Sequence, residues 1–475
     1  MQKEFSLNII ILLAINLLIK PFFIFGIDRT VQNIVGTEQY GIYFTLLSFA
    51  YILQILNDFG IQNFNSREIS QNRSLVLQYL PNILILKTVL AVVFLIGIFL
   101  LGGLAGYAQY YHLLFFLGLN QVLVSLIFYL RSNLTGLGHF RTDSLLSAFD
   151  KLLMIIFCAI LLWVSPFQEN FKIEWFVYAQ TVALAIAALT VGFFVGKNLP
   201  QKISYKFDFQ LTFSLLKRSF PFALVILLTT IYTRVDVIMI EKMLVDGTHH
   251  AGVYGAAYRL LDASNMVGYL FATLLLPMLS RMLKKGEDVN QLVGLGFRLI
   301  FSCSVALAAS IFFFQEDIMN LLYQDATPYW GEVLGWLMFT FVVVAGAYVY
   351  GSLLLADGDL HTLNKIFGLS IILNMCLNYF LIPILMAEGA AIATLVTQLF
   401  VLIFEMILGV KKKLIRTNWK LIVKAITFFL GCLIISYTVS NIQNTIWLLL
   451  FIITFSLNLI LAIGLKILKF RELLK

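Results

Sequence analysis

Residues 81–103 read PNILILKTVLAVVFLIGIFLLGG, an apolar run whose single charged side chain is Lys87. The hydrocarbon core of a bilayer is spanned by about 20 such residues in helical form, so this run predicts a transmembrane helix. The rest of the chain has the same character. Of its 475 residues, 60% are hydrophobic and 12% are charged, against about 25% charged in soluble domains. The composition therefore predicts a polytopic membrane protein.

Fourteen segments of the chain meet the same criterion of length and apolarity. They are residues 6–26, 40–60, 81–103, 107–130, 144–165, 174–196, 219–245, 251–280, 291–315, 330–356, 363–383, 388–410, 421–440 and 445–468. The longest connection, residues 197–218, is polar and lysine-rich and is too short to be a separate domain. We therefore expect an all-α membrane protein with 14 transmembrane helices.

Positive charge alternates between the two sets of loops. One set, together with both termini, holds 23 lysines and arginines, whereas the opposite loops hold only Arg29 and Lys172. Because basic residues collect on the cytoplasmic side of a membrane protein, we expect both termini to be cytoplasmic. The formal net charge of +8 follows mostly from this topology. It therefore does not indicate a nucleic-acid partner.

Two short passages recur in the same order. Residues 40–43 (YGIY) parallel 251–254 (AGVY), and residues 138–142 (GHFRT) parallel 358–362 (GDLHT). The spacing predicts a repeat of six spans. An even number of spans keeps both copies in one orientation, so we expect a pseudo-two-fold axis along the membrane normal with a site between the halves.

The repeat also predicts the domain organisation. The polar connector falls at the junction of the two copies, and the last two spans lie outside the repeat. We expect an N-terminal six-helix half at residues 1–196, a cytoplasmic linker at 197–218, a C-terminal six-helix half at 219–413, and two additional transmembrane helices with a cytoplasmic tail at 414–475.

Several of these passages resemble a known family. Residues 252–260 (GVYGAAYRL) resemble the opening of span 8 in polysaccharide-export members of the multidrug/oligosaccharidyl-lipid/polysaccharide (MOP) flippase superfamily. Residues 374–383 (NMCLNYFLIP) and 388–394 (EGAAIAT) resemble the same group. The passage from Lys20-Pro21 to Asp58-Phe59-Gly60 looks like the O-antigen or repeat-unit (Wzx-type) branch. The resemblance covers essentially the whole chain.

The resemblance implies a function. Members of this family translocate undecaprenyl-pyrophosphate-linked oligosaccharide across the bacterial inner membrane by alternating access, often coupled to a cation gradient. The partners it implies are the lipid-linked oligosaccharide, a coupling cation (proton or sodium), membrane lipid and the polysaccharide polymerase machinery.

Eight basic residues lie inside the predicted spans. They are Lys20, Lys87, Lys151, Arg234, Lys242, Arg259, Arg298 and Lys424. A cation near the bilayer centre costs about 2.5–3.5 kcal/mol on insertion scales, so it usually faces a partner or a wet cavity. Lys87 and Lys424 are near span ends and are expected to snorkel to the interface. Lys242 is expected at the outer rim beside Glu241.

Three of these cations are candidates for binding the substrate: Arg234, Arg259 and Lys20. Arg234 lies near the middle of its span, and either pairs with another helix or contacts phosphate, which suits the guanidinium fork. Arg259 shares a helical face with Asp262, so a local salt bridge is the alternative to a headgroup contact. Lys20 is expected near the outer end of the first span, either snorkelling or lining a cavity at the bend that Pro21 causes.

Asp236, Asp262 and Asp58 are the candidates for binding a coupling cation, and the sequence does not select one of them. Asp58 could instead cap its loop or pair with Arg67. A mainly basic set of intramembrane residues favours an anionic cargo, which argues against a multidrug antiporter.

No pattern in the chain indicates catalysis. It has no Gly-rich phosphate loop, nucleophile elbow or metal-spaced histidine cluster. We therefore expect a transporter that is not an enzyme and needs no cofactor. The alternatives are a lipid II flippase or a multidrug antiporter of the same superfamily, and, less well supported, a membrane polysaccharide polymerase.

Overall fold

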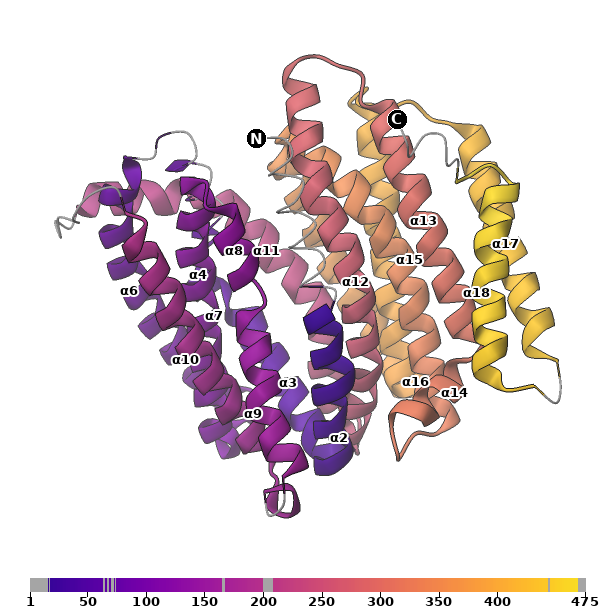
Figure 1. Cartoon of the computed structure of the whole chain (residues 1–475), viewed down its shortest axis with the longest axis horizontal. Helices are drawn as coiled ribbons and strands as arrows, with labels where there is room; N and C mark the ends of the chain where they lie inside the picture. The colour runs from indigo at the N-terminus through magenta and orange to yellow at the C-terminus, as the bar shows by residue number, and fades with distance from the viewer. Residues whose placement is uncertain are drawn as a thin grey trace. The chain divides into compact units, whose positions relative to one another are not determined.

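The computed structural model describes residues 16, 18–62, 65, 68–69, 72, 74–164, 167–199, 208–442 and 445–468. In this part of the chain the regular structure is entirely helical, which confirms the all-α prediction (Figure 1). Eleven of the described helices are long and apolar enough to cross a membrane. Helices suit hydrocarbon because they satisfy their backbone hydrogen bonds internally.

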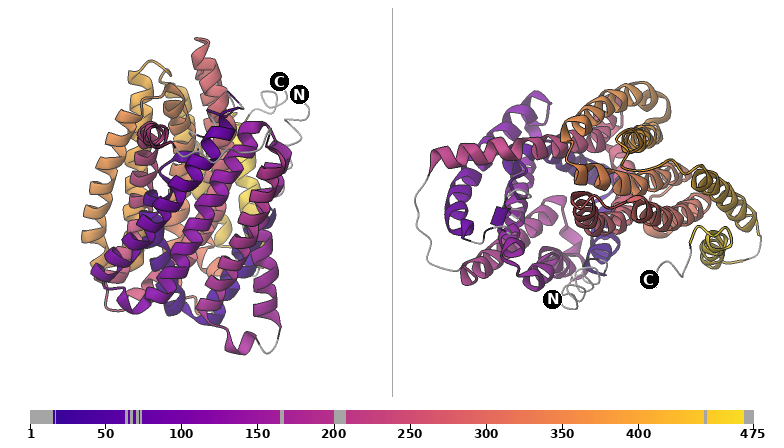
Figure 2. Two further views of the ribbon diagram at one scale, coloured as in Figure 1. Left: turned by 90° about the vertical axis from the view of Figure 1, so that its left-hand side faces the viewer. Right: turned by 90° about the horizontal axis from the view of Figure 1, so that it is seen from above.

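Contacts divide the chain into two compact units, residues 1–238 and 239–475. In the first unit, α7 packs against both α6 and α10 (Figures 1 and 2). The elements of this unit are η1 (Phe23–Asp28), α2 (Arg29–Val35), α3 (Thr37–Leu53), α4 (Ile55–Asp58), α6 (Leu75–Leu104), η2 (Ala108–Tyr110), α7 (Tyr111–Leu137), α8 (Phe140–Leu146), α9 (Phe149–Trp163), η3 (Gln168–Asn170), α10 (Ile173–Lys197) and most of α11 (Phe209–Met243).

In the second unit, the largely buried helix α15 packs against α12, α13 and α16. Its elements are α12 (Gly247–Lys284), α13 (Asn290–Phe313), α14 (Gln315–Leu322), α15 (Pro328–Asp357), α16 (Leu360–Lys411), α17 (Trp419–Ser440) and α18 (Trp447–Gly464). Each of the fourteen predicted segments is helical over most of its described residues.

Helix α16 consists of two arms separated by a kink at Met386, whose φ is 53°. The amide of Ala387, just past the kink, donates to the Tyr329 hydroxyl at 2.8 Å. That bond satisfies a backbone donor that the interrupted helix would otherwise leave open. The two arms of α16 therefore supply the two predicted spans at 363–383 and 388–410.

The first span extends further than predicted. Helical structure runs on through the π-helical η1 and through α2 to Val35, nine residues beyond the predicted end at residue 26. Polar side chains at Asp28, Arg29 and Gln32 lowered the local hydropathy and hid this continuation. Asp28 and Gln32 are buried inside the protein, and the Tyr40 hydroxyl donates to Asp28 at 2.6 Å.

Helix α11 begins at Phe209, within the segment predicted as a linker. Its first turns pack on the start of α6, where the Asp208 amide donates to Asn82 at 2.6 Å. Leu215 is buried there, whereas Phe209 and Phe213 are exposed. Helix α11 therefore starts ten residues before the seventh predicted span, which begins at residue 219. One side of this added segment is packed, and the other carries exposed phenylalanines.

Candidate functional site

The most buried charge pair in the described part of the first unit joins Lys87 and Asp58. The Lys87 ammonium lies 3.0 Å from the Asp58 carboxylate, and Lys87 is only 5% exposed. Ser125 on α7 donates to the same carboxylate oxygen at 2.9 Å. The prediction that Lys87 snorkels to the interface is therefore wrong: Lys87 on α6 points inward because α4 supplies an anion.

The backbone after Asp58 holds this carboxylate in place. Phe59 has a φ of 50° and Gly60 a φ of 66°, both in the left-handed region. A Cβ on Gly60 would lie 3.0 Å from the backbone nitrogen of Ala223, so glycine is required for this close approach. Asp58 thus ends α4 with its side chain turned to α6. Its predicted alternative partner, Arg67, lies outside the described residues.

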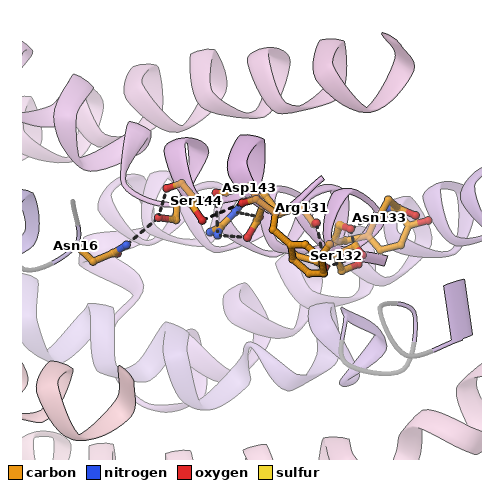
Figure 3. A network of polar contacts seen from close by, with 10 residues as sticks. Asn16, Arg131, Ser132, Asn133, Asp143 and Ser144 are labelled. Carbon is orange, nitrogen blue, oxygen red and sulfur yellow. Dashed lines mark hydrogen bonds and ion pairs between the residues drawn. The ribbon is translucent and has the colours of Figure 1, made fainter. Parts of the chain in front are cut away.

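A second group of charges lies around Lys20, and we call it the Lys20 cluster. Arg131, at the end of α7, makes a two-point contact with Asp143 of α8, at 2.7 and 3.2 Å (Figure 3). Lys151 of α9 lies 3.3 Å from Asp150. Lys20 lies close enough to interact electrostatically with Asp150, Lys151 and Arg131. The cluster holds three cations and two carboxylates, an excess of one positive charge.

The position of Lys20 differs from the prediction. We expected it near the outer end of the first span, but the first helix continues to Val35, about 23 Å further along at 1.5 Å per residue. One turn before it, Asn16 donates to Ser147 at 2.8 Å (Figure 3). Lys20 therefore sits beside Asp150 and Lys151, about ten residues inside the apolar segment Phe140–Trp163, and not near the outer end of its own span.

Arg234 of α11 stacks on an aromatic ring. Its guanidinium carbon lies 5.0 Å from the centroid of the Tyr51 ring on α3. A cation over an aromatic face gains about 0.5–2 kcal/mol, depending on how far it is removed from water. This contact fixes the guanidinium against α3; the residue as a whole is half-buried, and its Nη1 atom is buried. Asp236, two positions later, is completely buried.

Arg259 and Asp262 lie on α12 in the second unit. Their nearest charged atoms are 3.7 Å apart, and their side chains are 14% and 29% exposed. The local salt bridge predicted from their spacing is therefore present, in a loose and partly open geometry.

The other three intramembrane cations, Lys242, Lys424 and Arg298, have different contacts from one another. Lys242 pairs with Glu241 at 3.2 Å at the end of α11, and Lys424 donates to the Leu465 carbonyl at 2.9 Å beside the end of α18. Arg298 of α13 lines a cavity within the second unit.

Glu405 is a buried acid that was not among the residues predicted from the sequence. Glu405, on the second arm of α16, is 3% exposed, and its Oε2 atom has no hydrogen-bond partner among the described residues. Room for the carboxyl comes from Gly351 of α15, where a Cβ would lie 3.0 Å from Glu405 Oε1. An acid inside the apolar run VLIFEMIL was the available signal. The described residues contain no group of three or more His, Cys, Asp and Glu side chains that could hold a metal.

Family models and curated proteins match this chain. A model described as polysaccharide biosynthesis protein matches residues 6–283, and one described as MatE matches residues 221–380. The "Lipid III flippase" of Escherichia coli (strain K12) is 25% identical over 194 residues, or 40% of this chain and 45% of that protein. The protein of the same name from Shigella flexneri gives the same values. The chain thus spans about half the length of the curated relatives it matches.

Solved structures share the fold. A structure described as the lipid II flippase MurJ in an inward closed conformation has a TM-score of 0.73 at 15% identity, covering 98% of this chain and 100% of the other. An inward-facing multidrug resistance MATE family transporter of the MOP superfamily has a TM-score of 0.65 at 12% identity, covering 85% and 98%.

These relatives and structural neighbours are flippases and transporters, not enzymes. Together with the eleven apolar helices, they establish a multi-pass membrane protein. The first family model matches more than half of the chain. The chain therefore belongs to the polysaccharide biosynthesis protein family.

Proposed function

We propose that this protein moves an undecaprenyl-pyrophosphate-linked oligosaccharide, a polysaccharide repeat unit, from the cytoplasmic to the outer leaflet of a bacterial inner membrane. The observation that carries the proposal is the Lys20 cluster, in which three cations outnumber two carboxylates among apolar helices. A pyrophosphate that leaves water needs charged donors to replace its hydration, and arginine and lysine supply them. The family membership supports the same class of cargo.

Lys20, Arg234 and Arg259 are the residues we assign to the anionic headgroup. The guanidinium of Arg234 lies over the Tyr51 ring, and that of Arg259 lies 3.7 Å from Asp262. The planar guanidinium fork suits phosphate oxygens, which supports this assignment. The polyprenyl tail remains in lipid while the headgroup passes. A repeat unit of O-antigen or lipopolysaccharide type is the specific cargo we propose, and the polymerase machinery is the functional partner.

Alternating access is the mechanism we propose. Residues 1–196 and 219–413 act as two rocking halves joined by 197–218, and residues 414–475 add two helices outside the repeat. Both termini are cytoplasmic, in accord with the loop charges. Asp236, Asp262 and Asp58 are the candidate sites for a coupling proton or sodium ion. Asp58 is the weakest of the three, because Lys87 already neutralises it.

Lipid II is the main alternative cargo. The curated relatives are named lipid III flippases, and a lipid II flippase shares the fold. Both cargos present a polyprenyl pyrophosphate, so the cations alone do not discriminate between them. A multidrug antiporter fits less well, because cationic drugs would be repelled by a net positive cluster.

The test is transport by the purified protein in proteoliposomes that contain a fluorescent polyprenyl-pyrophosphate oligosaccharide. Accessibility of the sugar to an added lectin reports its movement between leaflets. We expect wild type to move this lipid, and Arg234→Ala to abolish both this movement and export of surface polysaccharide at normal membrane levels. Lys242→Ala on the same helix is the matched control and should retain activity. Wild-type transport of lipid II but not of the oligosaccharide lipid would overturn the proposed cargo.

A further inference from the structure

A large cavity opens within the second unit, between α13, α15, the second arm of α16 and α17. Its volume is about 1200 Å³, beyond the range of about 300–1,000 Å³ that is usual for small-molecule pockets. The inner walls are apolar, and they include Phe297, Phe301, Ile403, Met406, Ile426 and Phe429. A space of this size and character accommodates hydrocarbon chains.

The mouth of this cavity is basic. Arg416 and Lys420 lie there with Asp288, the single carboxylate of the lining, and Arg298 lines the cavity about two turns further along α13 from Asn290. Asn290 donates to Asp288 from its amide and its side chain, and with Arg416 this holds the pKa of Asp288 below its ordinary value. The carboxylate is therefore ionised at neutral pH, and the lining keeps an excess of two positive charges.

Two helices begin at the same mouth. Helix α13 starts at Asn290 and α17 starts at Trp419, and the Arg416 amide donates to the Asn290 side chain at 2.7 Å, which ties the two starts together. Helix N-termini carry partial positive charge and favour anions. Trp419 is 72% exposed, as expected for an aromatic residue at a membrane–water interface.

We propose that this cavity binds an anionic phospholipid, with its phosphate at Arg416 and Lys420 and its acyl chains along the apolar walls. Basic pockets between transmembrane helices on the cytoplasmic side suit the headgroups of anionic lipids. The cytoplasmic placement of the mouth rests on the proposed topology, whereas lipid binding itself does not.

A resident phospholipid fits this cavity better than the transported lipid does. All of the walls belong to one unit. A cargo site that opens alternately to two sides lies between repeats and changes shape as they rock. The cavity therefore suits a lipid that stays bound throughout the cycle.

Blocking the cavity is possible without disturbing its walls. A Cβ at Gly294, which lines the cavity, meets no atom within 4 Å, and leucine is a better helix former than glycine. Gly294→Leu therefore fills open space. Ala425→Leu, on the facing helix α17, fills it independently. Gly368→Leu is the matched control, because Gly368 has the same free space and lies on α16 away from the cavity.

The test measures bound lipid by native mass spectrometry. The purified chain is incubated in mild detergent with equal amounts of phosphatidylglycerol and phosphatidylcholine. We expect wild type and Gly368→Leu to retain phosphatidylglycerol, and each blocking variant to retain about tenfold less. The double variant Arg416→Gln/Lys420→Gln should lose the preference for phosphatidylglycerol. The control Lys284→Gln/Lys285→Gln, which removes exposed cations outside the cavity, should keep it.

Three results would overturn the assignment. Undiminished phosphatidylglycerol on both blocking variants would place the lipid elsewhere. Equal retention of the two lipids by wild type would remove the role of the basic mouth. Displacement of phosphatidylglycerol by an equal amount of undecaprenyl phosphate would make the cavity a cargo site. Because the readout is bound lipid, a failed transport assay would count against the proposed function alone.

Discussion

Two buried carboxyl groups, one in each unit, have opposite surroundings. Asp58 meets an ammonium at 3.0 Å and a hydroxyl at 2.9 Å. Glu405 is at least as deeply buried, yet its Oε2 atom has no hydrogen-bond partner in the described part of the chain. The presence of an acid in an apolar helix therefore does not by itself indicate the role of that acid. Its role depends on whether a neighbouring helix supplies a partner, as α6 does for Asp58, or only space, as α15 does for Glu405.

Removing the partner of Asp58 should have the largest effect. Lys87→Met leaves a buried carboxylate without its counter-ion, and we expect a loss of about 3–5 kcal/mol in the free energy of unfolding. Thermal unfolding in detergent measures it.

The double variant Lys87→Met/Asp58→Asn provides the control for that experiment. It removes both charges and should recover most of the lost stability, because no uncompensated charge remains. If the single variant unfolds at the wild-type temperature, the pair has no structural importance.

Removing the space for Glu405 should have an intermediate effect. Gly351→Ala places a methyl group 3.0 Å from Glu405 Oε1, and overpacking of this kind typically costs about 1–3 kcal/mol. Gly368→Ala on α16 has free space and should instead gain up to about 1 kcal/mol from helix propensity. The same unfolding assay compares them. Equal stability of the two variants would mean that Glu405 has room to move.

Among the intramembrane sites, breaking the Arg259–Asp262 pair should change the free energy of unfolding least. We expect Asp262→Asn to alter the free energy of unfolding by less than about 1 kcal/mol, because the pair is loose and partly exposed. Transport should nevertheless fall if Arg259 then loses its orientation. A stability loss as large as that of Lys87→Met would contradict the distinction between the two pairs.

The surface ion pair of Lys412 and Asp359 should have the smallest effect on the free energy of unfolding, and this effect should depend on pH. Lys412 lies 2.9 Å from Asp359, which also accepts from Thr362, and these contacts hold the pKa of Asp359 well below its ordinary value. Asp359 therefore stabilises the fold above the unfolded-state pKa of about 4, and the contribution is lost as the pH falls through the folded-state value.

Asp359→Asn keeps the cap on α16 but removes the charge. We expect a loss below about 1 kcal/mol at pH 7, and the difference from wild type should shrink as the pH falls below about 4. Unfolding temperatures across this pH range measure it. A difference in unfolding temperature between Asp359→Asn and wild type that grows as the pH falls would contradict a lowered pKa of Asp359.

The sequence by itself determined the class, the helices and much of their number. Residues 81–103 read as a span, and α6 contains them, because hydrocarbon imposes length and apolarity on each segment locally. The largest differences in boundaries are at α11, which begins ten residues before its predicted span, and at the first span, where polar residues are buried by the protein. Asp28 and Gln32 ended the predicted first span too early for this reason.

The tertiary structure decided what each intramembrane charge does. Lys87 was expected at the interface and lies against Asp58, 29 positions away in the chain. Lys20 was expected near the outer end of its own span and instead lies near Asp150 and Lys151 of α9, inside the apolar segment Phe140–Trp163. Depth and pairing depend on where each helix stops and which face it turns to its neighbours. Packing between helices sets both, and no local pattern encodes them.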